Sequence, residues 1–181
     1  QIVGLAATDP VIGGSLYFGP VLDMTNLPRH PFWPDAAPQS EAAQVAVGLL
    51  RAVWRDGDDL KAHALSDFRL NAWVPGGRFL YGPDQIAEFA APIRAAFGSR
   101  ARLRIEHIAE VPYLGEARDV AVRWSLAGWH EGEGRYGTPT GAPVLIMAVS
   151  HFRVIGDRVR EEVTIWDDIA VLRQVAGHAR G

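Results

Sequence analysis

Residues 143–166 read PVLIMAVSHFRVIGDRVREEVTIW, and this stretch decides the fold. Two runs rich in β-branched residues flank Gly156-Asp157, a dipeptide typical of a two-residue hairpin turn. The stretch therefore predicts two long antiparallel strands, over residues 143–155 and 158–166.

The sequence before this hairpin predicts further strands. Apolar and polar residues alternate over 102–111 and again over 120–127, as they do in strands with one buried face. A shorter alternating run over 67–74 turns at Pro75-Gly76-Gly77 into a partner over 78–81. Because strands of this length twist, the sheet is expected to curl, and its concave side must be filled.

Helical spacing of apolar residues predicts the elements that cover the sheet. Helices are expected over residues 40–57, 60–65, 83–97 and 169–175. Pro92 removes a backbone donor from the third, so that helix is expected to kink or break around residues 88–92. Helices followed by a meander of antiparallel strands predict an α+β fold, in which a curved sheet and helices enclose a largely apolar pocket.

The composition indicates two segments. Residues 1–39 contain closely spaced prolines and glycines, which favour extended or turn backbone, and apolar residues that include Phe32 and Trp33. We expect them to form an extended arm packed on its own domain or on a second subunit. Residues 40–181 are expected to form a single domain, since a chain of 181 residues supports one well-buried core.

Composition also argues against several kinds of partner and cofactor. With a net charge of −3 and Lys61 as the only lysine, the chain has little with which to bind nucleic acid. Cysteine is absent and the histidines never take a recognised metal spacing, so neither a metal nor another cofactor is expected. No apolar run approaches the ~20 residues of a membrane helix, and no basic secretion signal begins the chain, so we expect a cytoplasmic protein.

Four motifs resemble one family. They are Val120-Ala121-Val122-Arg123-Trp124, Pro139-Thr140-Gly141, His151-Phe152-Arg153-Val154 and the run from Glu161 to Gln174. Over residues 40–175, these motifs and the order of elements resemble the SnoaL-like (polyketide cyclase-like) branch of the nuclear transport factor two-like superfamily. The resemblance implies a cone-shaped fold, a homodimer formed through the sheet, and a small hydrophobic ligand such as a polyketide-like cyclic carbonyl compound.

The residues that carry the family's chemistries differ in this chain. In the polyketide cyclases that it resembles, a histidine and an aspartate on neighbouring strands handle the proton, and the matching positions hold Ser150 and Thr164. Neither is a general base near neutral pH. His151 is one residue from the histidine position, which places it on the opposite face of the strand. Val74 replaces the acid of ketosteroid isomerases, and Arg123-Trp124-Ser125 lacks the Arg-x-Asp pair of epoxide hydrolases.

Strand alternation leaves three candidate acids or bases, His107, Glu162 and Asp167. His107 is either a pocket histidine that titrates near neutrality or a hydrogen-bonded core or rim residue. Glu162 is either a carboxylate of raised pKa or the partner of Arg123 or Arg153 across strands. Asp167 either takes part in the chemistry or caps the terminal helix.

The predicted pocket wall is rich in flat aromatic side chains, which suit a ring-containing ligand. It consists of Trp54, Trp73, Tyr81, Trp124, His130, Tyr136, Ser150, Thr164 and Trp166. For His130, a pocket and a surface position are both open. Gly132-x-Gly134-x-x-Gly137 spells a dinucleotide-binding fingerprint, but no βαβ unit surrounds it. We expect a flexible loop there that serves as a pocket flap, with Tyr136 at its tip.

Three functions fit these observations. The first is a cofactor-free lyase or isomerase that transfers a proton on a hydrophobic cyclic carbonyl compound, with Asp167, His107 or Glu162 as acid or base. The second is a non-catalytic ligand-binding or dimerisation scaffold, which Ser150 and Thr164 favour. In the third, the chain is one half of a tandem protein whose other domain does the chemistry.

Overall fold

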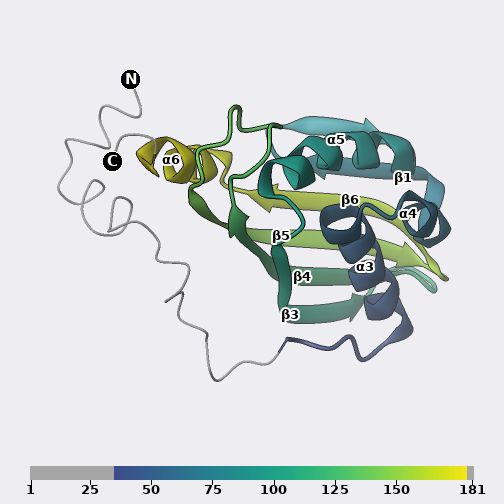
Figure 1. Ribbon diagram of the computed structural model, residues 1–181. Helices are drawn as coiled ribbons and strands as arrows, with labels where there is room; N and C mark the ends of the chain where they lie inside the picture. Colours follow the sequence, from purple (N-terminus) through teal and green to yellow (C-terminus); the bar gives the residue numbers. More distant parts are fainter. Residues whose placement is uncertain (1–34, 179–181) are drawn as a thin grey trace.

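The computed structural model describes residues 35–178, which form a curved six-stranded sheet with helices on its concave side (Figure 1). The elements are α3 (Glu41–Arg51), the π-helical turn η1 (Ala52–Asp56), α4 (Asp59–Leu65), β1 (Ser66–Val74), β2 (Arg78–Tyr81), α5 (Gly82–Phe97), β3 (Arg102–Pro112), β4 (Arg118–Trp129), β5 (Pro143–Ile155), β6 (Arg158–Trp166) and α6 (Asp168–His178). The predicted strands and helices are present close to their expected bounds. The arm predicted over 1–39 lies outside the described residues, except for residues 35–39.

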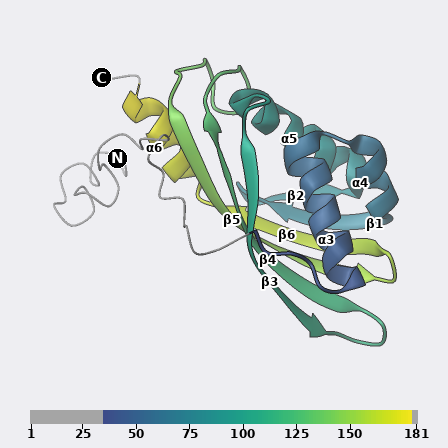
Figure 2. The same ribbon diagram turned by 60° about the horizontal axis from the view of Figure 1, so that its bottom comes forward.

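The sheet is mixed and strongly curved. Its strand order is β2-β1-β6-β5-β4-β3, and all neighbours pair antiparallel except β1 and β6, which run parallel. The Gly156-Asp157 turn joins β5 to β6 as predicted, with Gly156 at a left-handed φ of 60°. Figure 2 shows the sheet curling around the helices. The predicted α+β fold with a curved sheet is therefore confirmed.

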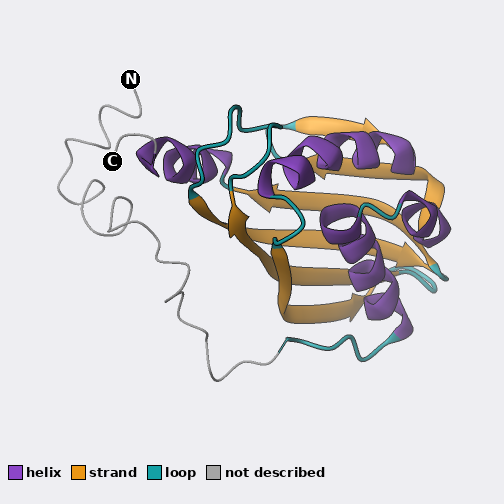
Figure 3. Cartoon of the chain, in the orientation of Figure 1, coloured by secondary structure: helices purple, strands orange, loops and turns teal. Residues whose placement is uncertain are grey.

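The concave face of the sheet and three helices share one hydrophobic core. Figure 3 shows α3, α4 and α5 on this face, whereas α6 lies at one end of the sheet, where it contacts β5. The Ser40 hydroxyl accepts a hydrogen bond from the first turn of α3 at 3.0 Å, as a helix cap does. From α3 and α5, respectively, Leu50 and Phe97 point into the core and are each 1% exposed. Within residues 35–178, no helix is long and apolar enough to cross a membrane.

A β-bulge in β3 changes which residues face this core. Ile105 pairs with Trp124 on the inner face, but the register shifts before the next pair, which joins His107 to Arg123. One extra residue, Glu106, turns His107 to the outer face, where it is exposed. The prediction that His107 shares the inner face with Ile105 is therefore wrong, because simple alternation takes no account of the bulge.

Helix α5 runs through Pro92 without a break. Proline leaves the carbonyl oxygen of Glu88 without its usual N–H partner inside the helix. Both residues are exposed, so water can hydrogen-bond to that oxygen. Of the kink or break predicted there, the break is wrong, and the helix remains one continuous wall of the core.

Candidate functional site

A chain of hydrogen bonds runs through the core between β4, β5 and β6. The Trp124 indole N–H donates to the Ser150 hydroxyl at 2.9 Å, and the Ser150 and Thr164 hydroxyl oxygens lie 2.6 Å apart. Thr164 donates in turn to Oε1 of Glu162 at 2.6 Å. Each of these four residues, which we call the buried hydroxyl chain, is at most 1% exposed. His151 lies on the opposite face of β5 and is exposed, as predicted.

The carboxyl group at the end of this chain has an unusual protonation equilibrium. Burial raises the pKa of Glu162 from an ordinary 4.5 to about 7, although the Thr164 hydroxyl, which donates to the carboxyl group, and the nearby Trp54 indole both act to lower it. Oε1 is bonded to Thr164, whereas Oε2 has no hydrogen-bond partner among the described residues. A carboxyl group that titrates near neutral pH can both take up and release a proton there.

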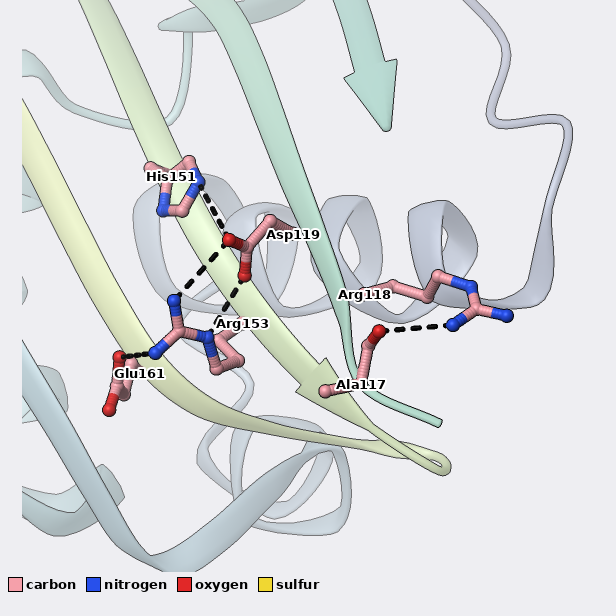
Figure 4. Close-up of polar contacts among 6 residues, drawn as sticks. All are labelled: Ala117, Arg118, Asp119, His151, Arg153 and Glu161. Atoms are coloured by element: carbon pink, nitrogen blue, oxygen red, sulfur yellow. Dashed lines mark hydrogen bonds and ion pairs between the residues drawn. The ribbon is translucent and has the colours of Figure 1, made fainter. Parts of the chain in front are cut away.

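The arginines considered as partners of Glu162 lie on the outer face of the sheet. Figure 4 shows Arg153 between Asp119 and Glu161, which are its direct neighbours on β4 and β6. Its Nε lies 3.0 Å from Asp119 Oδ1, and its Nη1 lies 2.7 Å from Glu161 Oε2. Arg123 pairs with a glutamate of β3. Pairing of Glu162 with either arginine is therefore wrong, because adjacent positions of a strand face opposite sides.

Tryptophan rings surround the carboxyl end of the buried hydroxyl chain. Trp54, in η1, stacks on Trp124 with ring centroids 5.9 Å apart, and it meets Trp166 edge-on at 5.2 Å. The Trp54 indole N–H is buried near Glu162 and has no hydrogen-bond partner among the described residues. π-helical turns of this kind occur often at functional sites, where they re-aim a side chain.

Two of the predicted wall residues face away from the interior. Trp73 of β1 and Tyr81 of β2 are 46% and 50% exposed, whereas their neighbours Ala72 and Leu80 take the inner positions. Both placements are wrong because strand alternation outweighs the aromatic character of a side chain. The other predicted wall residues are buried or partly buried, namely Trp54, Trp124, His130, Tyr136, Ser150, Thr164 and Trp166. That they line a ligand pocket remains a prediction.

The two aspartates at the start of α6 have different partners. The Asp167 carboxylate accepts a hydrogen bond from a backbone N–H in the first turn at 2.9 Å and is exposed, so it caps the helix. Asp168 binds three donors, the Tyr136 hydroxyl and the Trp166 indole at 2.9 Å and the Arg135 guanidinium at 2.5 Å. Burial would raise the pKa of Asp168, but these donors hold it below its ordinary value. Sequence reasoning missed Asp168, because no local pattern links it to a loop about thirty positions earlier.

The glycine-rich loop after β4 is packed against α5. A Cβ on Gly134 would lie 2.0 Å from the carbonyl oxygen of Pro92, and Gly132 is almost as close to the helix backbone. The Arg135 N–H donates to the same Pro92 oxygen at 3.1 Å. Tyr136, the predicted tip of a flap, is only 7% exposed. The flap prediction is therefore wrong, because the glycines let the loop backbone touch the helix.

His130 is fully buried where β4 ends, which excludes a surface position. Its Nδ1 lies 3.2 Å from the Thr140 hydroxyl, whereas Nε2 has no hydrogen-bond partner among the described residues. Burial lowers the pKa of His130, so the imidazole is neutral at neutral pH. Across residues 35–178, no group of three or more histidine and acidic side chains could hold a metal ion.

Two cavities lie at the edges of the molecule. One of about 440 Å³ lies between β2, α5 and the glycine-rich loop, and Arg78, Phe89 and Arg135 are among its walls. The other, of about 490 Å³, opens on the outer face of the sheet beside Met147. Phe89 meets Trp54 edge-on, with centroids 6.2 Å apart. The Phe89 ring therefore contacts both the first cavity and the indole next to Glu162.

Comparison with known proteins identifies the family. The sequence profile of the SnoaL-like polyketide cyclase family matches residues 44–175, whereas no curated protein matches the chain by sequence. A protein from Acidithiobacillus ferrooxidans assigned as a polyketide cyclase has a TM-score of 0.64 at 23% identity, over 80% of this chain and 100% of that one. One from Jannaschia sp. CCS1 assigned as a SnoaL-like polyketide cyclase has a TM-score of 0.61 at 19% identity, over 79% and 97%.

A third structure carries the ketosteroid isomerase-like fold. This protein, from Catenulispora acidiphila in complex with trimethylamine, has a TM-score of 0.56 at 15% identity, over 74% of this chain and 92% of that one. At these low sequence identities, the structural similarity shows only that the fold is shared. The family profile, however, covers most of the chain from α3 to α6. The chain therefore belongs to the SnoaL-like polyketide cyclase family.

Proposed function

We propose that the protein binds a small hydrophobic ring compound with a carbonyl group and transfers a proton on it, with Glu162 as acid and base. The observation that carries this proposal is the free, buried Oε2 of Glu162 on a carboxyl group whose pKa is about 7. A general base works best when its pKa is near the working pH. The capping role of Asp167 and the exposed position of His107 leave Glu162 as the candidate inside the core.

The buried hydroxyl chain suits this role. Thr164 and Ser150 fix Oε1, so that Oε2 is left to react. The carboxylate takes a proton from the carbon beside the carbonyl group, and the electrons of the broken C–H bond form the C=C bond of an enolate. The protonated carboxyl then returns its proton to the same carbon or to another one, which yields exchange or isomerisation. Electrons are neither gained nor lost overall, so the step needs no redox cofactor.

Exchange of ring-ketone protons tests this function. With 2-tetralone in D2O, the wild-type protein is expected to speed replacement of the α-protons by deuterium, and Glu162→Gln to slow it by about 100-fold or more. Proton NMR measures the exchange directly. Glu161→Gln is the matched control, because Glu161 is the neighbouring residue on the outer face and is expected to keep the wild-type rate. Equal exchange by both variants would remove Glu162 from the mechanism.

The same burial favours a second candidate, a non-catalytic ligand-binding protein. Every member of the buried hydroxyl chain is at most 1% exposed, and the aromatic rings around it contact one another. A family member that retained the hydrophobic core but lost its catalytic activity would have a closed interior of this kind. Binding of 2-tetralone without proton exchange would favour this candidate over the first.

We also propose that the outer face of the sheet pairs two copies of the chain. This face exposes Trp73, Phe79, Met147, Val149, Val163 and Ile165 on adjacent strands. An exposed apolar patch across several strands is typical of an interaction site, and a second copy brings an identical patch to it. The family resemblance implies a homodimer formed through this sheet.

Sedimentation velocity tests this pairing. Met147→Glu places a charge at a position that is 72% exposed, so it is expected to shift a dimer to monomer without unfolding it. Leu60→Glu, at an 85% exposed position on α4, is the control and should leave the dimer intact. A wild-type monomer at micromolar concentration would contradict the proposal.

A further inference from the structure

Two neighbouring residues of the core, Trp54 and Glu162, each have a polar atom without a well-formed hydrogen bond. The Trp54 Nε1–H group and Glu162 Oε2 are both buried, and neither makes a hydrogen bond of ordinary geometry among the described residues, although the indole lies close enough to the carboxyl group to lower its pKa. They belong to residues that are 2% and 1% exposed. A buried donor without an acceptor destabilises a folded protein, so a ligand that brings an acceptor to the Trp54 N–H stabilises this site.

The Trp54 indole is held in a fixed orientation. Its ring contacts Trp124, Trp166 and Phe89 at centroid distances of 5.9, 5.2 and 6.2 Å. The turn that carries it is braced from α5, because the Arg94 guanidinium donates to the carbonyl oxygen of Val53. A donor that is oriented before its acceptor arrives loses little entropy when it binds, as hydrogen-bond donors in active sites require.

One cavity lies next to a side chain that contacts this donor. The 440 Å³ cavity has the volume of an ordinary ligand site, and Phe89 forms part of its wall. The same Phe89 ring lies edge-on against Trp54. A ligand that reaches the two atoms from this cavity therefore requires Phe89 to move.

We propose that Trp54 is a catalytic residue whose indole N–H binds the carbonyl oxygen of a neutral ring ketone, with the adjacent carbon against Oε2 of Glu162. This inference rests on the proposed function for its choice of ligand. The geometry fits the chemistry, because negative charge develops on the carbonyl oxygen as the α-proton leaves, and an N–H donor in a water-excluded core stabilises that charge. A neutral carbonyl suits the site better than a carboxylate, which would place a second negative charge beside Glu162.

Two probes that differ only in a carbonyl group in place of a CH2 group test the subsite. 2-Tetralone and tetralin share the same fused rings, but only the first carries a carbonyl group. In protein labelled with ¹⁵N at tryptophan, 2-tetralone is expected to shift the Trp54 indole resonance and tetralin to leave it near its free position. Trp54→Phe assigns that resonance. Should this variant fail to fold, phenylalanine substitutions of the other tryptophans assign it by elimination.

The affinity difference between the probes is the second readout. Wild-type protein is expected to bind 2-tetralone about tenfold more tightly than tetralin, as one hydrogen bond to a buried donor allows. Trp54→Phe should bring this ratio close to one. Equal binding of the two probes, no binding of either, or a tetralone complex with an unmoved Trp54 resonance would overturn the proposal.

The two proposals can fail separately. Deuterium exchange that depends on Glu162 but is unaffected by Trp54→Phe would leave the proposed function in place and remove the role of Trp54. A preference for 2-tetralone that depends on Trp54, without any deuterium exchange, would support the proposed subsite and contradict the proposed catalysis.

Discussion

Gly134→Ala is expected to lower the free energy of unfolding by about 3 kcal/mol, at the upper end of the usual cost of overpacking. The added Cβ would lie 2.0 Å from the carbonyl oxygen of Pro92, and helix backbone cannot swing aside as a side chain can. Moving the loop instead would break the hydrogen bond from Arg135 N–H to Pro92 and pull Tyr136 from Asp168. Urea denaturation followed by circular dichroism measures the change.

Gly177→Ala is the matched control for that experiment. Gly177 lies in α6, where an added Cβ would meet no heavy atom within 4 Å, and its φ is not left-handed. In a helix, alanine is favoured over glycine by up to about 1 kcal/mol, so this variant should be as stable as the wild type or slightly more so. A Gly134→Ala protein of undiminished stability would show that the loop does not touch α5.

Glu162 is expected to make the protein less stable as the pH rises. Its pKa is raised to about 7 in the folded state, so the native protein holds this proton more tightly than an unfolded chain, whose glutamate titrates near 4.5. The resulting stabilisation is fully present below pH 4.5 and is lost as the pH rises through about 7. Between about pH 4 and pH 8, the wild type should lose about 3 kcal/mol relative to Glu162→Gln, which cannot ionise.

The difference between the two unfolding free energies isolates this effect, since other titrating groups cancel in the subtraction. Denaturation of both proteins at a series of pH values supplies the two curves. Glu161→Gln alters a carboxylate of the outer face, so its curve should run parallel to that of the wild type. Parallel curves for Glu162→Gln and the wild type would mean that the Glu162 carboxyl is hydrated or paired in solution.

Alternation in the sequence predicted the inner face well where the strands keep it, which β5 does throughout and β6 does from Glu161 onward. It placed Glu162 and Thr164 on the inner face and His151 on the outer one. It failed at His107, because a bulge adds one residue to β3 and nothing in that segment marks where the extra residue falls.

Local sequence patterns could not predict contacts between segments that are far apart in the chain. The role of Asp168 depends on a loop that returns to the start of α6, and the sequence shows only two adjacent aspartates there. The glycine-rich loop gave a usable signal of another kind. Its closely spaced glycines indicate a backbone that must approach something closely, and here that neighbour is a helix rather than a phosphate.

The parallel pairing of β1 with β6 governs the order in which the molecule can assemble. The two strands pair although roughly ninety residues separate them, as the pair of Ala72 with Glu162 illustrates. During synthesis, the β1–β2 hairpin cannot pair with the rest of the sheet until β6 has left the ribosome, because β6 is the strand that joins them. The apolar interior therefore closes late, and such long-range closure makes folding slow compared with that of helical proteins of similar size.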